Sequence, residues 1–129
     1  RYHKVGQKKP NAWGFYDLLG NVAEWTMDKY DPAYFGKLAA DAKGTFFVKP
    51  DKPRAYRTAR GGGFKSQPEG LRCADRLPQV EAWNQRDPQI PRSKWWMTDG
   101  DYVGFRLVRP LKQPTPEEAG AFFKEMLGQ

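Results

Sequence analysis

The sequence has very few of the side chains that most often carry out chemistry: one cysteine and one histidine in 129 residues. A single cysteine, Cys73, forms no disulfide within the chain, so internal cross-links do not hold this fold together. Catalytic triads, zinc clusters and cysteine–histidine pairs need more of these residues, so such sites are not expected. His3 lies near the chain start, where residues often fray, and we expect no functional role for it.

A long hydrophobic run is also missing. No stretch of the sequence contains the roughly 20 consecutive apolar residues that a membrane-spanning helix needs. The first methionine is Met27, and no apolar signal-peptide core precedes it. We therefore expect no membrane span, and a soluble piece of a longer protein whose N-terminal region is missing.

Aromatic residues, in contrast, are abundant, with five Trp, six Tyr and eight Phe. Thirteen Gly and eleven Pro interrupt the sequence often, which disfavours long helices. This composition is typical of a turn-rich folded domain with aromatic packing rather than of a disordered tail. The length suits a single domain.

The formal net charge is +7, and basic residues gather in Arg1–Lys9 and Lys49–Arg60. Basic clusters near aromatic residues can bind nucleic acid through phosphate contacts and base stacking. The alternatives are a solvated surface or a face that meets an acidic partner segment. Because the sequence contains no motif with base-reading geometry, we favour these alternatives over nucleic-acid binding.

Local patterns predict short elements joined by turns. We expect strands over residues 22–26, 56–60, 71–76 and 102–108, the last in the core, short helical segments over 15–19 and 33–38, and loops over 41–52 and 79–98. Gly20-Asn21 is a turn signal. Three successive glycines, Gly61–Gly63, permit positive φ angles or close backbone approach.

Near the C-terminus, Thr115–Glu118 (TPEE) is a capping box with Pro at the first helical position. The amphipathic helix that follows has one apolar stripe, formed by Ala119, Phe122, Phe123, Met126 and Leu127. We expect this stripe to dock on its own domain. The chain therefore divides into residues 1–110, part of a domain, and residues 111–129, a C-terminal amphipathic helix.

Four sequence blocks occur in an order that indicates a family. They are Asn11–Thr26 (NAWGFYDLLGNVAEWT), Arg60–Phe64 (RGGGF), Arg72–Arg76 (RCADR) and Gly104–Val108 (GFRLV). They resemble the N-x-x-G-L-Y-D-M-x-G-N-V-W-E-W signature, the R-G-G-S-aromatic segment, the R-x-A-x-R strand and the G-F-R strand of the sulfatase-modifying-factor (formylglycine-generating enzyme) superfamily. The blocks span residues 11–108, and the C-terminal residues beyond them fall outside the pattern.

The resemblance implies an α+β, C-type-lectin-like fold with little regular secondary structure. It also implies that residues 1–110 are the C-terminal part of such a domain, so that the fold is incomplete in this chain. The missing N-terminal part of the same domain, or another chain, is then the expected partner of the strand faces that bear Trp25, Phe105 and Leu107.

The turn around Gly20 offers oxygen ligands for a hard cation. Asp17 and Glu24 carry carboxylates, and the turn can aim main-chain carbonyl groups inward, which suits calcium. The resemblance implies a structural calcium ion bound by the side chains of Asp17 and Glu24 and the carbonyl groups of Gly20 and Val22. The alternative is that Asp17 caps a turn and Glu24 pairs with a nearby arginine.

Oxidases of this superfamily bind Cu(I) through two thiolates, the soft ligands that this ion prefers. The resemblance places those cysteines near the interval that here is Phe64–Leu71 (FKSQPEGL), which contains none. Ser66 stands about where the first thiolate would be, and the second has no counterpart. Cys73 is expected to be a small core residue. Copper binding is therefore not supported, and no residue receives a catalytic role.

A second group of residues is a candidate ligand groove. Rigid aromatic rings with a few polar groups suit clefts for a peptide or glycan, and the candidates are Trp83, Asn84, Arg86, Trp95 and Trp96. Aromatic packing that pins the long loop over residues 79–98 is the slightly favoured alternative.

These features predict a non-oxidase binding or scaffold domain with a structural calcium site, in a bacterial and extracytoplasmic setting. The competing hypothesis is a formylglycine-generating or related oxidase that acts on cysteine in sulfatase-type substrates, with its catalytic groups elsewhere. The absence of a thiol pair favours the first hypothesis. A related branch of the superfamily uses non-haem iron, but His3 is the single imidazole ligand in this sequence.

Overall fold

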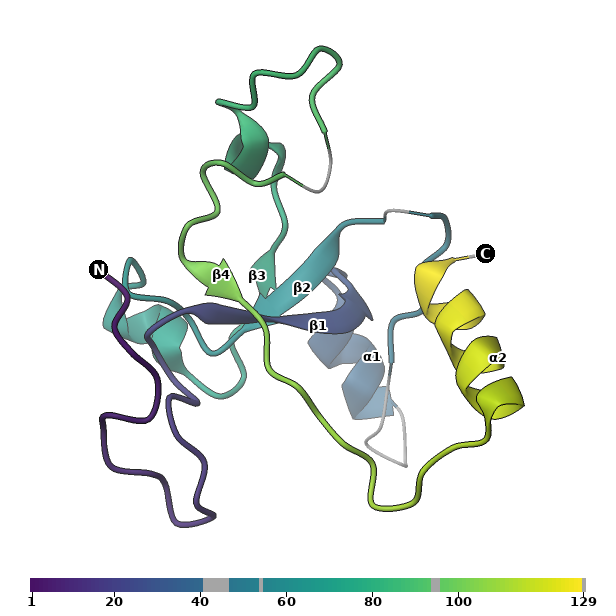
Figure 1. Cartoon of the computed structure of the whole chain (residues 1–129), viewed down its shortest axis with the longest axis horizontal. Helices are drawn as coiled ribbons and strands as arrows, with labels where there is room; N and C mark the ends of the chain where they lie inside the picture. Colours follow the sequence, from purple (N-terminus) through teal and green to yellow (C-terminus); the bar gives the residue numbers. More distant parts are fainter. Residues whose placement is uncertain (41–46, 54, 94–95, 129) are drawn as a thin grey trace.

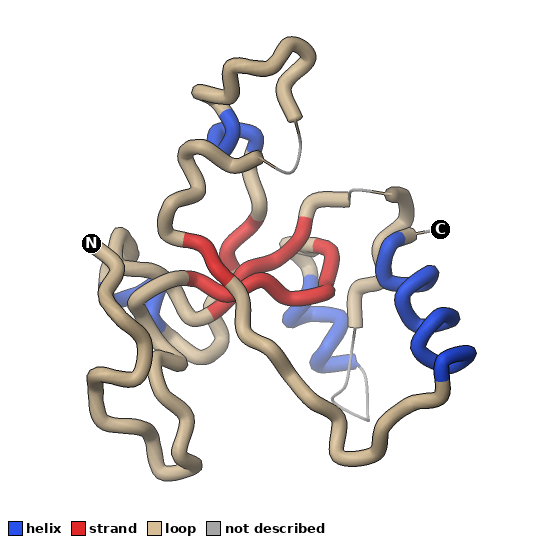
Figure 2. The backbone as a smooth tube through the Cα atoms, in the orientation of Figure 1, coloured by secondary structure: helices blue, strands red, loops and turns tan. Residues whose placement is uncertain are grey.

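The computed structural model describes residues 1–40, 47–53, 55–93 and 96–128 of the chain. A small sheet lies at the centre, with one helix behind it and another at its side (Figure 1). Loops and turns make up most of the rest, as Figure 2 shows. The elements are β1 (Ala23–Lys29), α1 (Tyr34–Ala40), β2 (Arg57–Arg60), the 3-10 helix η1 (Pro68–Leu71), β3 (Leu77–Pro78), the 3-10 helix η2 (Glu81–Asn84), β4 (Val103–Gly104) and α2 (Pro116–Leu127).

The sheet is mixed and has the strand order β3-β2-β1-β4. Strand β1 pairs antiparallel with β2, with Glu24 opposite Arg60, and parallel with β4. Strand β2 pairs antiparallel with β3. The two central strands supply the fully buried residues Ala23, Thr58 and Ala59. The fold is thus α+β, as the sequence predicted, with a core centred on β1 and β2.

A buried arginine joins α1 to both central strands. One terminal nitrogen of Arg76 lies 3.1 Å from the carboxylate of Asp28 and 3.2 Å from the hydroxyl of Thr58. The centre of its guanidinium group also lies 3.7 Å from the ring centroid of Tyr34, the first residue of α1. Because a guanidinium group is attracted to the face of an aromatic ring, this contact holds α1 against the sheet.

Three of the expected elements are present with shifted ends. Strand β1 covers most of the strand predicted over residues 22–26, and β2 covers most of the strand predicted over 56–60. Helix α1 covers most of the helix predicted over 33–38. Of the loop expected over residues 41–52, residues 41–46 lie outside the described part. Residues 47–52 have no helix or strand.

Two predicted elements are wrong. Residues 71–76 form the end of η1 and a turn, in which the amide of Asp75 donates to the carbonyl of Arg72 at 3.0 Å, so a strand ladder has no place there. Residues 15–19 contain bends rather than a helical turn, because Asp17 adopts a positive φ of 50°. An α-helix requires negative φ throughout.

The strand expected over residues 102–108 is also much shorter, and its end does not lie in the core. Strand β4 contains two residues and lies at the sheet edge. Beyond it, Phe105, Leu107 and Val108 are 73%, 87% and 85% exposed. The physical reason is that β4 has a neighbouring strand on one side, and no other part of the chain that the structure describes covers the segment that follows it. Trp25 is instead half-buried, because its ring packs edge-on against that of Trp83.

The C-terminal helix begins with the predicted capping box. The amide of Glu118 donates to the Thr115 hydroxyl at 3.2 Å, and the amide of Thr115 donates to the Glu118 carboxylate at 2.8 Å. Met126 is the buried residue of the stripe, and Arg57 of β2 donates to its carbonyl oxygen at 2.5 Å. The helix thus docks on its own chain through its last turn, while Phe123 and Leu127 stay about half exposed.

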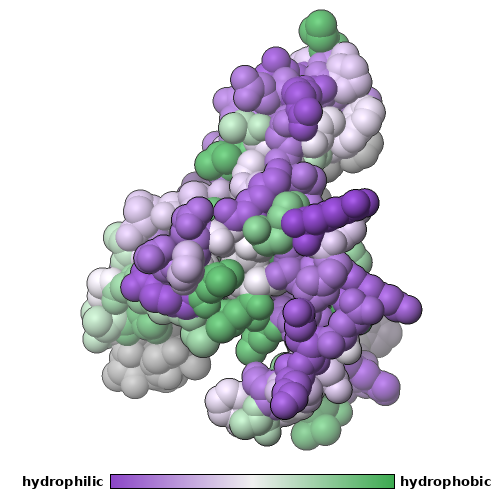
Figure 3. All heavy atoms as spheres, turned by 90° about the vertical axis from the view of Figure 1, so that its left-hand side faces the viewer, coloured by the Kyte–Doolittle hydropathy of each residue, from purple (hydrophilic) through white to green (hydrophobic). Residues whose placement is uncertain are grey.

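Apolar side chains also lie on the surface. On the face in Figure 3, hydrophobic residues gather across the middle of the molecule, among hydrophilic ones.

No helix in the described ranges has the length and apolar character needed to cross a membrane.

Candidate functional site

A pocket of about 360 Å³ brings together the chain start, the loop before β1 and the segment after β4. It is lined by Val5, Gly6, Tyr16, Asp17, Asn21, Val22, Glu24, Phe105 and Arg106. Three of the four predicted calcium-binding residues border this pocket, namely Asp17, Val22 and Glu24. Gly20 lies in the turn between them, where its amide donates to the carbonyl of Gly61 at 2.7 Å.

The guanidinium group of Arg106 occupies the centre of this site. Its Nε lies 2.8 Å from one carboxylate oxygen of Glu24, and a terminal nitrogen lies 2.6 Å from the other. The same terminal nitrogen donates to the main-chain oxygens of Tyr16 at 2.9 Å and Asp17 at 3.3 Å. Such a two-pronged arginine–carboxylate pair is among the stronger polar contacts in proteins. Four oxygen atoms from three residues thus surround one cation.

The charge of Arg106 is stabilised by this environment. Hydrogen bonding to Glu24 is the main cause that raises the pKa of Arg106, while burial acts in the opposite direction. The negative charges of Glu24 and Asp17 raise the pKa further. Both carboxylates of the predicted site therefore act on the guanidinium group.

The loop before β1 is shaped by two residues with positive φ. Asp17 accepts a hydrogen bond from the amide of Gly6 at 2.7 Å through its side chain. Asn21, with φ of 60°, exchanges two hydrogen bonds with the main chain of His3, at 3.0 and 3.2 Å. The chain start is therefore held against this loop, and the expectation that His3 lies in a frayed end is wrong.

The pairing of Glu24 with Arg106 is the alternative to calcium that the sequence left open, and a bound cation would need the same oxygen atoms. Carboxylate and carbonyl oxygens are the ligands that calcium takes, and those of Glu24, Tyr16 and Asp17 already surround a positive group. Among the described residues there is no group of three or more His, Cys, Asp or Glu side chains that could hold a metal. Main-chain oxygens would therefore have to complete the coordination, and Arg106 would have to leave Glu24.

Gly61, the first of the three successive glycines, lines a second pocket, of about 230 Å³. It is lined by Leu18, Leu19, Glu24, Arg60, Gly61 and Cys73. Gly61 has a φ of 84°, and a Cβ atom there would lie 2.8 Å from the carbonyl oxygen of Leu18. The predicted need for glycine, through positive φ and close backbone approach, is confirmed. The hydroxyl of Ser66 accepts from the amide of Gly63 at 3.0 Å and so closes the turn.

Cys73 is exposed, so the prediction of a core residue is wrong. The reason is local: residues 72–75 turn instead of continuing as a strand, which places the side chain at the second pocket. Its carbonyl oxygen accepts a hydrogen bond from the guanidinium group of Arg60.

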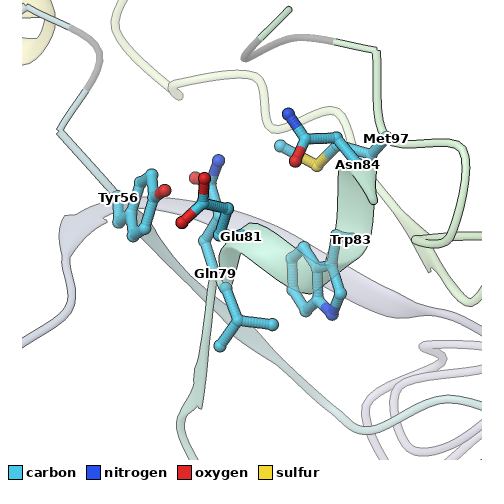
Figure 4. A pocket seen from close by; sticks show the side chains of 7 residues that line it. Tyr56, Gln79, Glu81, Trp83, Asn84 and Met97 are labelled. Carbon is cyan, nitrogen blue, oxygen red and sulfur yellow. The ribbon is translucent and has the colours of Figure 1, made fainter. Parts of the chain in front are cut away.

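The first residue of the proposed ligand groove, Trp83, is buried, with 4% of its surface exposed. Its indole nitrogen donates to the hydroxyl of Tyr102 at 2.7 Å. The cavity beside it measures about 10 Å³ and is shown in Figure 4, with Glu81 and Asn84 among its lining residues. Because this is about the size of one water molecule, the cavity does not admit a peptide or glycan.

The other groove residues have separate environments. The amide nitrogen of Asn84 donates to the carbonyl of Ser93, and Arg86 forms a 2.5 Å ion pair with Asp99. Trp96 is 42% exposed, and Trp95 lies outside the described residues. The structure therefore places Trp83, Asn84 and Arg86 in contacts within the long loop and leaves the ring of Trp96 partly in solvent.

Sequence reasoning missed two aspartates that organise this loop. The carboxylate of Asp87 accepts from the amides of Gln89 and Ser93, both at 2.9 Å, and Asp99 accepts from the amide of Arg86 at 3.0 Å. Asp87 directly precedes Pro88, a dipeptide typical of side-chain-capped turns, and this signal was available. The sequence places Arg106 in the G-F-R block, and no local pattern links it to Glu24.

Similar sequences occur as parts of much longer proteins. The chain is 38% identical over 72 residues to the serine/threonine-protein kinase pkn1 of Chlamydia pneumoniae, covering 52% of this chain and 10% of that protein. It is 38% identical over 68 residues to Pkn1 of Chlamydia trachomatis, covering 49% of this chain and 10% of that protein. The chain therefore spans about a tenth of the length of the curated relatives it matches.

A solved structure and a family model complete the comparison. Treponema denticola variable protein 1 aligns with 81% of this chain and 31% of its own chain, with a TM-score of 0.45 and 22% sequence identity. The family model for the sulfatase-modifying factor enzyme 1-like domain (FGE-sulfatase) matches residues 1–111. Because this match covers most of the 129 residues, the chain belongs to the family of sulfatase-modifying factor enzyme 1-like domains.

Proposed function

We propose that this chain is a non-oxidase binding or scaffold domain of its family, with a C-type-lectin-like fold and a structural calcium site. The observation that carries the proposal is the presence of one cysteine in the sequence. Cu(I) chemistry in this family relies on two soft ligands, and Cys73 alone does not supply them. Ser66, near the expected position of the first thiolate, uses its hydroxyl to accept from the amide of Gly63.

The relatives support a modular role. In two kinases the similar region covers about a tenth of the protein. A region of this kind within a longer chain suits a binding or scaffold unit whose partners are elsewhere on that chain. We extend this role to the present domain as a proposal.

A peptide-oxidation assay tests the non-oxidase proposal against the oxidase alternative. The chain is loaded with copper and incubated with a sulfatase-type peptide that contains the target cysteine, and mass spectrometry follows the peptide. We expect no loss of the thiol. Conversion of the peptide cysteine to the aldehyde by the parent chain, together with no conversion by Cys73→Ser, would support the oxidase instead.

The calcium proposal rests on the pocket that Asp17, Val22 and Glu24 border, and it involves the side chains of Asp17 and Glu24 and the carbonyl groups of Gly20 and Val22. Binding to the native state alone raises the melting temperature as ligand concentration rises. We therefore expect a higher melting temperature in calcium than in excess chelator. Glu24→Gln should abolish that difference, whereas Glu69→Gln, at an exposed position in η1, should preserve it. Identical melting curves in calcium and chelator would refute the site.

A further inference from the structure

The segment after β4 is held to the rest of the chain by one side chain. Within the described ranges, every side-chain hydrogen bond made by residues 105–109 comes from Arg106. The flanking residues Phe105 and Leu107 are largely exposed, and Arg109 is exposed as well. The attachment of this segment next to β1 therefore depends strongly on Arg106.

The atoms that hold Arg106 are also oxygen ligands suited to calcium. The guanidinium group uses both carboxylate oxygens of Glu24 and the main-chain oxygens of Tyr16 and Asp17. A calcium ion needs six to eight oxygen ligands at roughly 2.3–2.6 Å, and it would draw on the same carboxylate. Two cations a few ångströms apart repel each other, most strongly where water is partly excluded. The guanidinium group of Arg106 and a calcium ion therefore cannot both bind the two carboxylate oxygens of Glu24 at the same time.

The charges at the site favour exchange of one cation for the other. Asp17 and Glu24 bring two negative charges, and Arg106 neutralises one of them. A calcium ion in place of the guanidinium group would neutralise both. Arg106 carries its charge on a flexible side chain and is about one-third exposed, so it can move into solvent without unfolding the sheet.

We propose that Arg106 is the built-in competitor of calcium for Glu24, so that calcium binding releases Arg106 and loosens residues 105–109 from β1. This inference rests on the proposed calcium site. Calcium in the pocket would then weaken the attachment of the exposed apolar segment that contains Phe105 and Leu107. A calcium site alone would not have this effect.

Calcium affinity measured by isothermal titration tests the competition. The probe is calcium chloride, added to the chelator-treated full chain and to two variants. Arg106→Gln removes the competing charge and keeps a long polar side chain, and we expect it to bind calcium at least about tenfold more tightly. Arg109→Gln removes one positive charge from the same segment outside the site, and its affinity should stay within about twofold of the parent chain.

A second readout follows Arg106 directly. In a nitrogen-15 NMR spectrum of the parent chain, the Nε–H signal of Arg106 should shift or broaden as calcium is added, because it loses Glu24 as its acceptor. An affinity of Arg106→Gln equal to or weaker than that of the parent chain would overturn the competition and leave the calcium site standing. An unmoved Nε–H signal at saturating calcium would do the same. Absence of calcium binding in both proteins would overturn the calcium site itself and, with it, this inference.

Discussion

The indole nitrogen of Trp83 donates a hydrogen bond of 2.7 Å to the hydroxyl of Tyr102, and their rings meet nearly at right angles with centroids 5.8 Å apart. Trp83 belongs to η2, and Tyr102 directly precedes β4. Trp25 of β1 packs against the same indole with centroids 5.4 Å apart. This aromatic cluster therefore joins η2, within the long loop, to β1 and to the edge of the sheet.

Replacement of Tyr102 should show the value of this bond. Tyr102→Phe keeps the ring but leaves the indole N–H of the buried Trp83 without its acceptor, so we expect a loss of about 1–3 kcal/mol in the free energy of unfolding. Tyr16→Phe, at a residue that is 43% exposed, is the matched control and should cost less than about 0.5 kcal/mol. Urea unfolding followed by tryptophan fluorescence measures both. Equal stabilities of the two variants would contradict the prediction.

A methyl group at Gly62 should be poorly tolerated. Gly62 has a φ of 63°, and a Cβ atom there would lie 2.7 Å from the carbonyl oxygen of Gly70. We expect Gly62→Ala to destabilise the chain by more than about 1 kcal/mol, because both the φ angle and the close approach are unfavourable. Gly120→Ala, in open space within α2, should instead stabilise it by about 0.5–1 kcal/mol. Thermal unfolding of the two variants should give shifts of opposite sign, and a neutral Gly62→Ala would show that the turn adapts.

The long loop should loosen in acid. Burial by itself would raise the pKa of Asp87, but hydrogen bonds from Gln89 and Ser93 outweigh it and lower the pKa. The pKa of Asp99 is lowered mainly by the backbone amide of Arg86. Because both folded-state pKa values lie below the unfolded value of about 3.9, the stabilisation is complete above that pH and is lost as the pH falls through the folded values.

Hydrogen exchange of residues 79–100 between pH 6 and pH 3 tests this dependence, after correction for the intrinsic exchange rate. We expect protection of the loop to fall below about pH 4. In the double variant Asp87→Asn and Asp99→Asn, the loop should be less protected at pH 6 and respond less to acid. A loop equally protected at both pH values in the parent chain would contradict the role of the two carboxylates.

The exposed apolar segment after β4 should promote association of the isolated chain. Phe105, Leu107 and Val108 lie beside a sheet edge, and exposed apolar edges favour pairing with another chain or segment. We expect light scattering after size exclusion to show species larger than one chain. Replacing Phe105 and Leu107 by serine should shift the chain toward the monomer. A strictly monomeric parent chain, with strong hydrogen-exchange protection of β1, residues 61–63 and residues 104–108, would show that residues 1–129 need no partner.

The sequence by itself determined features whose physics is local. The capping box at Thr115 requires residues three positions apart, and the turn at Gly61–Gly63 requires backbone freedom that glycine provides. The order of the four motif blocks was sufficient to indicate the family, because a motif is a property of the chain and not of its packing. The strands β1 and β2 were predictable for a similar reason, since each is a short extended segment bounded by turn or glycine signals nearby in the sequence.

Only the tertiary structure decided which distant groups meet. Arg106 reaches Glu24 across 82 positions of sequence because β4 pairs parallel with β1, and no local pattern encodes that pairing. The exposure of Cys73 and of Phe105 also depends on which parts of the chain cover them, and the hydrophobicity of a side chain alone does not predict this. Burial and ion pairing are properties of three-dimensional neighbours, so only the folded chain decided which arginine pairs with Glu24.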